Sequence, residues 1–281
     1  MIAHVDHGLY VNMSNDDYHR APGISKSALD LVAVSPSYYK WAMDAPRDDT
    51  RTTALDEGTA IHMLLLEPEK FADEFVVAPE VDRRTKDGKA EWVEFCAEVE
   101  GSGKRVLDAE TMRRLMMMRE STMAHPMARW IFEQDGRNES SIFWTDPETG
   151  RQCKCRPDRY IWVDDQPIIV DVKKTAAFDK FHYSVRDYRY HVQQAMYSDG
   201  FEKHFGVKPK FWFLRVSSTI ELGRYPVSVD DLSDEFIVDQ DMPWGTVLGG
   251  YSLYRRDLQT YHDCMEQNDW LHVGTITPRK Y

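Results

Sequence analysis

Two aspartates and a lysine near the middle of the chain lie in apolar surroundings that such residues normally avoid. Within "CKCRPDRYIWVDDQPIIVDVKKT", Asp158 and Asp171 are thirteen positions apart, and Lys173 follows the second aspartate by two places. Two carboxylates brought together at low dielectric repel each other, so either one takes up a proton or a cation neutralises both. Mg²⁺ suits such a place, because it prefers oxygen ligands and usually keeps several waters.

Lys173 cannot be a metal ligand while it is protonated. It can orient or deprotonate an attacking water, or stabilise negative charge that develops on a phosphate. The simpler alternative is an ordinary ion pair between Asp171 and Lys173 on the solvated face of a strand. The triplet "DVK" taken alone favours that alternative, because such triplets are common by chance.

The segment that carries these residues is expected to form three short strands in a meander. The strands are "SSIFWTD", "QCKCRPDRYIWV" and "IIVDVKKT", separated by turns at "PETG" and "DDQP". Since alternate residues of a strand share a face, Asp171 and Lys173 point to one side and Val172 to the other, into a core. Pro157 removes a ladder donor, which predicts an irregular point that leaves Asp158 free to lean towards Asp171.

Helices are expected on both sides of this segment. Ser27 and Ser35 are the expected N-caps of two early helices, and in "ALDEGTAIHMLLLEPEKF" helical spacing places Gly58 and His62 one above the other. Residues 80–105 read as an exposed flap around a short helix. A helix pair broken at Pro126 follows. After the meander come one long helix, "SVRDYRYHVQQAMYSDGFEKHFG", two strands and a last helix. This order predicts a layered α/β domain with a mixed sheet.

Composition and charge limit the functional class. The 281 residues are 42% hydrophobic and 29% charged, as in a soluble globular protein. No apolar run approaches the length of a membrane span and the start lacks the features of a signal peptide, so we expect a cytoplasmic protein without membrane contacts. The four cysteines are too scattered for a disulfide framework, and their spacing gives little support to an iron–sulfur cluster.

The net charge of −12 counts against a nonspecific nucleic-acid binder unless positive charge is gathered locally. Such gathering is visible in "RRTKDGK", "KCRPDR" and "DVKKT". The candidate DNA contacts in these stretches are Arg83, Arg84, Arg156 and Lys174. The alternative for each stretch is a solvated face, and for "RRTKDGK" the two are about equally favoured.

In chain order the candidate motifs are "GTAIH", Glu139 at the start of the first strand, "CRPD", "DVKK" and "QQAMY". This ordered set resembles the PD-(D/E)xK nuclease superfamily, and within it the RecB-like branch. The stretches "ISKSALDLVAVSPSYYKW" and "GTAIHMLLLEPEKF" are more specifically similar to the RecE-type exonuclease VIII domain of phages and prophages. Each motif alone is weak, and their order carries the specificity. The residues matched are His62, Glu139, Asp158, Asp171, Lys173, Gln193 and Tyr197.

The resemblance implies a restriction-endonuclease-like α/β core, with a mixed central sheet flanked by helices. It also implies that Asp158 and Asp171 bind one or two Mg²⁺, for which Mn²⁺ can substitute, with the carbonyl of Val172 and His62 as further ligands. Lys173 would then assist the water or the phosphate. Glu139, Gln193 and Tyr197 would complete the catalytic set, the last two by contacting DNA or bracing the metal-binding strand.

The resemblance further implies an exodeoxyribonuclease that degrades linear double-stranded DNA from 5′ to 3′ and leaves single-stranded 3′ tails for recombination. A ring-shaped trimer or tetramer and a single-strand annealing partner of the RecT type are implied with it, in a bacterial host. We expect one nuclease domain over 1–281. Its helical part with the histidine spans 1–135, the catalytic meander and Gln-x-x-x-Tyr helix 136–225, and an extension 226–281.

Two alternatives stay open. One is a RecB-like or Cas4-like nuclease that cuts single strands or acts as an endonuclease, although the cysteine spacing argues against the cluster-bearing members. The other is a DNA-end-binding module without catalysis. The intact set of Asp158, Asp171 and Lys173 argues against the second alternative, because an inactive module has no need to keep carboxylates crowded together.

Overall fold

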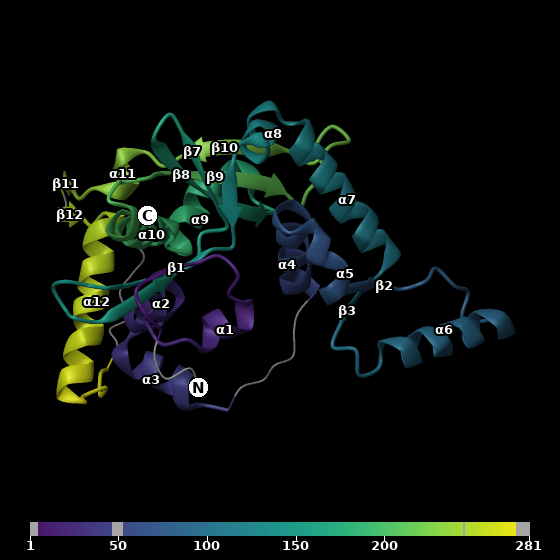
Figure 1. Cartoon of the computed structure of the whole chain (residues 1–281), viewed down its shortest axis with the longest axis horizontal. Helices are drawn as coiled ribbons and strands as arrows, with labels where there is room; N and C mark the ends of the chain where they lie inside the picture. The colour runs from purple at the N-terminus through teal and green to yellow at the C-terminus, as the bar shows by residue number, and fades with distance from the viewer. Residues whose placement is uncertain (1–4, 47–52, 244, 274–281) are drawn as a thin grey trace.

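The computed structural model describes residues 5–46, 53–243 and 245–273, and its centre is a five-stranded mixed sheet (Figure 1). The strand order is β10 (Val227–Asp231), β9 (Lys210–Ser217), β8 (Gln166–Thr175), β7 (Arg159–Val163) and β4 (Gly136–Asn138). β8 and β9 are parallel, and the other pairs are antiparallel. The predicted mixed sheet flanked by helices is confirmed.

Both faces of β8 are buried, and alternate residues enter two different cores. Ile169 contributes to a cluster under α2 (Lys26–Val34), α10 (Tyr190–Phe205) and α12 (Gly250–Gln267). Ile168 and Val172 contribute to a second cluster under α4 (Thr53–Leu66), α7 (Ala109–Ala124) and α8 (Pro126–Glu133). The predicted alternation is therefore correct, but the face that carries Asp171 is also covered by helices, since Asp171 is fully buried.

The predicted three-stranded meander is wrong as a single sheet. β5 (Ser141–Thr145) and β6 (Gln152–Cys155) pair with β1 (Gly8–Tyr10) in a separate three-stranded sheet, while β7 joins the central sheet. The expected middle strand breaks at residues 156–158. Pro157 cannot donate to a ladder, and the side chains of Arg156 and Asp158 bond to groups outside the strand. The predicted irregular point thus separates two sheets.

The helix boundaries follow local capping chemistry. The hydroxyl of Ser25, two residues before the expected Ser27, caps α2. α3 (Pro36–Asp44) is capped by Ser35, which accepts from the backbone N–H of Tyr38 at 3.0 Å, as predicted. Pro126 begins α8, which confirms the broken helix pair. The remaining early helix is α1 (Asn15–Arg20).

A separate arm extends from the body between α4 and α7 (Figure 1). Its base is the parallel pair β2 (Phe75–Val77) and β3 (Arg105–Leu107), and its outer part is α6 (Lys86–Val99). The short helices η1 (Pro68–Lys70) and α5 (Phe71–Glu74) connect α4 to this arm. The helix expected within the flap is longer than predicted, with 14 residues.

The crossover from β8 to β9 contains two α-helices rather than the one long helix that the sequence predicted. After η2 (Phe178–Lys180), α9 (Phe181–Asp187) ends before Arg189, whose φ of 54° is left-handed, and α10 starts at the next residue. A non-glycine residue in that region requires support. Ion pairs with Asp30 and Asp257 support the left-handed conformation of Arg189. Gly206, at φ 76°, ends α10 as predicted.

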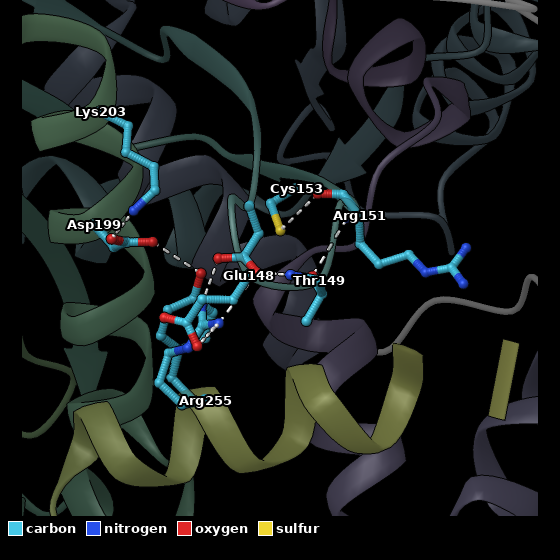
Figure 2. A network of polar contacts seen from close by, with 9 residues as sticks. Glu148, Thr149, Arg151, Cys153, Asp199, Lys203 and Arg255 are labelled. Carbon is cyan, nitrogen blue, oxygen red and sulfur yellow. Dashed lines mark hydrogen bonds and ion pairs between the residues drawn. The ribbon is translucent and has the colours of Figure 1, made fainter. Parts of the chain in front are cut away.

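The described C-terminal residues pack on the core. After α11 (Asp234–Ile237), β11 (Gln240–Met242) and β12 (Gly245–Val247), α12 places Tyr254 and Leu258 in the same cluster as Ile169. Figure 2 shows the contacts of Arg255 and the residues around it. They join α12 to the turn at Glu148 and Thr149. They also join α12 to Asp199 and Lys203 of α10. None of the helices in the described part of the chain is long and apolar enough to cross a membrane.

Candidate active site

Asp158 occupies the gap between the two sheets and bonds directly to β8. β7 begins at Arg159, which pairs with Val170, so β7 does not reach Val172. The carboxylate of Asp158 takes the place of a strand partner, because its Oδ2 accepts the backbone N–H of Val172 at 2.7 Å. The same oxygen lies 3.5 Å from Nδ1 of His62 on α4. The break in the predicted strand therefore places an acid beside the histidine.

Glu139 reaches the same point from the chain before β5. Its backbone N–H donates to the carbonyl of Asp158 at 2.9 Å, and its φ of 49° is left-handed. Its Oε2 accepts from Nε of Arg156 at 2.9 Å. Burial and then the charge of Asp158 raise the pKa of Glu139 to about 7, although Arg156 opposes the shift.

His62, Glu139 and Asp158 form a group whose side chains suit a divalent cation. One ligand atom of each residue lies within 4.8 Å of the others. Two carboxylate oxygens and an imidazole nitrogen are a donor set that Mg²⁺ or Mn²⁺ can use. Burial is the main cause of the raised pKa of Glu139, and the charge of Asp158 adds to it, so a cation between the two acids would offset their repulsion.

Asp171 has different partners from Asp158. Its Oδ1 accepts from the side-chain amide of Gln193 at 2.6 Å, and its Oδ2 lies 2.5 Å from Nζ of Lys173. Burial raises the pKa of Asp171, Lys173 opposes the shift and Asp158 adds to it. Asp171 therefore belongs with Lys173 and Gln193, and it forms its ion pair with Lys173. This set lies next to the group of His62, Glu139 and Asp158.

Members of both groups line one cavity of about 530 Å³, namely His62 and Glu139 from the first group and Lys173 from the second. α4 contributes Gly58 and His62 to its wall, which agrees with their predicted position on one helix face. Val172 and Lys173 contribute the edge of β8, and Lys70 and Arg105 the base of the arm.

The predicted DNA contacts divide into two pairs. Arg156 and Lys174 line the cavity, the first bonded to Glu139 and the second to Glu57 at 2.8 Å. Arg83 and Arg84 lie outside the described lining of the cavity, before α6. The Arg83 guanidinium stacks 3.6 Å from the ring centre of Trp92. The side chain of Arg84 is 95% exposed, so the structure does not bring this pair to the site.

Tyr197 lies one turn after Gln193 on α10 and packs into the core. Its ring contacts that of Phe211 on β9, with centres 6.5 Å apart. Burial raises the pKa of its hydroxyl well above the ordinary value, so the group stays neutral. The ring thus joins α10 to the central sheet, and the choice between DNA contact and bracing stays a prediction.

Sequence reasoning missed Tyr190 and Lys26. The Tyr190 ring lies under the ammonium of Lys173, with Nζ 4.7 Å from the ring centre. Lys26 Nζ lies 5.9 Å from the same ring. A signal existed for Tyr190, because it precedes Gln193 by three residues and such residues share a helix face. Lys26 gave no comparable signal, since only the tertiary fold brings α2 to this turn.

The family model described as a PDDEXK-like domain of unknown function (DUF3799) matches residues 25–223. Among solved structures, a candidate exonuclease from Eubacterium rectale is similar over 92% of this chain and 85% of its own, with 12% identity and a TM-score of 0.52. Protein SSO0001 is 13% identical over 72% of this chain and 83% of its own, with a TM-score of 0.31. Protein VC1899 from Vibrio cholerae is 13% identical over 70% of this chain and 49% of its own, with a TM-score of 0.22. No curated protein matches.

Only the first of these structures is similar enough to support the fold, and at 12% identity it supports nothing finer. The family match is broader, because it spans most of the chain and includes His62, Asp158 and Asp171 with the residues bonded to them. Together with the mixed sheet and the acidic site at the edge of β8, it shows that the chain belongs to the PDDEXK-like family DUF3799.

Proposed function

We propose that the chain is a metal-dependent exodeoxyribonuclease that degrades linear double-stranded DNA. The observation that carries the proposal is the group of His62, Glu139 and Asp158, with ligand atoms within 4.8 Å, beside the ion pair of Asp171 and Lys173 at one cavity. Neighbouring carboxylates can hold a divalent cation for metal-assisted phosphodiester hydrolysis, and a lysine beside them can offer positive charge to the phosphate.

The residues divide the chemical tasks in this proposal. His62, Glu139 and Asp158 hold the cation, and Asp171 and the Val172 carbonyl are further candidate ligands. When bound, Mg²⁺ or Mn²⁺ supplies a Lewis acid that activates water and neutralises charge on the phosphate. Lys173 offers a positive charge to the phosphate, and Gln193 fixes the carboxylate of Asp171 through its 2.6 Å hydrogen bond. Tyr197 braces the helix that carries Gln193.

The finer assignment rests on the resemblance to RecE-type enzymes. It includes digestion from 5′ to 3′, single-stranded 3′ tails, a ring of three or four copies, a RecT-type annealing partner and a phage or prophage gene expressed in a bacterial cytoplasm. Arg156 and Lys174 are the candidate phosphate contacts within the cavity, and Arg83 and Arg84 remain candidates for DNA farther along the arm. One nuclease domain over 1–281 is part of the same proposal.

A second candidate is a RecB-like or Cas4-like activity on single strands or within a strand. The cluster-bearing members would need four thiolates, and in this chain Cys153 and Cys155 are buried, Cys96 is exposed and Cys264 lies on α12. Among the described residues no group of potential metal ligands includes a cysteine.

Three DNA substrates separate these activities. Linear duplex, covalently closed circular duplex and single-stranded DNA are each incubated with the purified chain and Mg²⁺. We expect the linear duplex to be consumed while the closed circle survives. Equal rates on linear and closed duplex would favour an endonuclease, and preferential loss of the single strand would favour the RecB-like alternative. Binding to ends without any digestion would overturn the proposed activity.

A further inference from the structure

The Lys173 ammonium is held on two sides, by Asp171 of β8 and by Tyr190 in the first turn of α10. On one side, the carboxylate of Asp171 holds Nζ at 2.5 Å. On another, the ring of Tyr190 lies 4.7 Å below the same nitrogen. Gln193, three residues after Tyr190, holds Asp171. Residues three apart share one face of a helix, so the first turn of α10 contacts both members of the ion pair.

We propose that Tyr190 is a positioning residue for Lys173, acting through its aromatic face. This inference rests on the proposed nuclease function, and it adds a residue that the matched motifs do not contain. An ammonium within about 6 Å of an aromatic centre is attracted by the negative face of the ring. That attraction has a direction, and so it restricts where Nζ lies when the Asp171 carboxylate turns towards a cation or a phosphate approaches.

The surroundings hold the Tyr190 ring firmly enough for this task. It packs against the rings of Phe181 and Phe213, with centres 5.9 Å and 5.8 Å away. Its N-terminal neighbour is Arg189, whose left-handed backbone is tied to α2 by Asp30 and to α12 by Asp257. A catalytic group is positioned well only when its supporting residues are themselves locked.

Lys26 secures the same turn from α2. Its Nζ donates to the carbonyl of Tyr188 at 2.6 Å and pairs with Asp30 at 2.6 Å. The N-terminal end of α10 is therefore anchored by two helices at once. Tyr190 does not belong to the described lining of the cavity, so a change of its side chain affects Lys173 without removing a contact to substrate.

The test compares variants that keep or remove the aromatic face. Tyr190→Leu removes the face and keeps an apolar side chain, so kcat on linear duplex should fall about 2- to 30-fold, while KM stays unchanged. Tyr190→Phe should restore most of the rate, because the ring and not the hydroxyl is required. The matched control is Tyr188→Leu, whose side chain is exposed and stacks on Tyr190 without contacting Lys173; it should retain the parental kcat.

Replacement of Tyr190 by trifluorophenylalanine keeps the packing and weakens the ring face, which covers the case in which Tyr190→Leu folds poorly. Its kcat should lie below that of Tyr190→Phe. A parental kcat in both the leucine and the fluorinated variants would overturn the proposal, as would a loss of kcat equal to the loss of folded protein.

NMR of the chain labelled with ¹³C at lysine Cε separates this inference from the nuclease assignment. The Lys173 signal, assigned by its disappearance in Lys173→Arg, should be shifted upfield by the Tyr190 ring and move downfield in Tyr190→Leu but not in Tyr188→Leu. An unmoved signal overturns the positioning role whether or not the chain cuts DNA. A moved signal in a chain that does not cut DNA overturns the proposed function and leaves the contact in place.

Discussion

Asp158 and Asp171 both contact residues that line the cavity, but they are held by different bonds. Asp158 accepts a backbone N–H from β8 and lies beside His62, whereas Asp171 is fully buried in an ion pair with Lys173. Asp158 is thus the better placed metal ligand as the chain stands. Asp171 would have to exchange Lys173 for a cation before it could bind one.

At the residue scale, we predict that Lys173→Ala and Asp158→Asn fail in different ways. Lys173→Ala removes a charge-stabilising group and should lower turnover about 10²–10³-fold, while calorimetric Mn²⁺ binding persists. Asp158→Asn retains an oxygen that can accept the Val172 N–H but loses the ligand charge, so Mn²⁺ affinity and turnover should fall together. Lys173→Ala cutting linear duplex at the parental rate would show that "DVKK" is structural.

Spacing within one element identified residues better than charge did. His62 and Gly58 share a helix face at the cavity, and Gln193 reaches Asp171 from α10. Asp158 was chosen as a carboxylate in apolar surroundings, and Pro157 predicted the irregular point that frees it. Arg83 and Arg84 were chosen only for their charge, and they lie on the arm. Charge along a sequence gives no direction, whereas helical and strand periods do.

At the element scale, the packing of α10 on β5 depends on Gly200. A Cβ there would lie 2.5 Å from the Trp144 ring, which is almost fully buried and cannot move aside. Gly200→Ala should therefore destabilise the fold by about 1–3 kcal/mol, despite the better helix propensity of alanine. Gly58→Ala in α4 meets no atom within 4 Å and should be neutral or stabilise by up to about 1 kcal/mol. Urea unfolding of both variants measures this difference in stability. Equal urea midpoints for Gly200→Ala and Gly58→Ala would contradict the prediction.

A second prediction at this scale concerns the ion pair that joins α12 to the turn after β5. Arg255 contacts both oxygens of the fully buried Asp146, at 2.5 and 3.1 Å, and Thr149 donates to it twice. Burial alone would raise the pKa of Asp146, but these hydrogen bonds lower it to about 2. A depressed carboxyl pKa stabilises the fold above the unfolded pKa of about 4, and this contribution disappears as the pH falls to about 2.

Asp146→Asn should therefore cost about 1–2 kcal/mol of unfolding free energy at pH 7, with the difference from the parent closing between about pH 4 and 2. The control is Asp16→Asn, which breaks an exposed pair with Arg20 and should change the free energy of unfolding by at most about 1 kcal/mol at any pH. Chemical unfolding at a series of pH values measures both. A pH-independent difference for Asp146→Asn would contradict the assignment.

Boundaries of elements were predictable where a local cap decides them and not where tertiary contacts do. Ser35 with Pro36 and Gly206 mark helix ends through their own backbone preferences. The break at Arg189 depends on Asp30 and Asp257, which are remote in sequence. The division of the expected meander into two sheets likewise depends on β1, which pairs with β5 from the far end of the chain.

At the scale of the whole molecule, the acidic charge of −12 is compatible with DNA binding only if the basic groups of the cavity become available. In the structure Arg156, Lys173 and Lys174 are each paired with a carboxylate. Two of those carboxylates, Glu139 and Asp171, are candidate metal ligands. The fold class followed from the order of helices and strands, and the helix of the arm from the polar stretch at residues 80–105. The strand order did not follow, because sequence order does not fix which strands become neighbours.

The central claim is that this site hydrolyses DNA with a divalent cation held by its acidic residues. The most direct measurement is the release of acid-soluble nucleotides from linear duplex DNA by the purified chain, with Mg²⁺ and with excess EDTA, alongside Asp158→Asn. We expect release with Mg²⁺, none with EDTA, recovery when Mn²⁺ replaces Mg²⁺, and little release by the variant. Undiminished release in EDTA, or parental release by Asp158→Asn, would contradict the account.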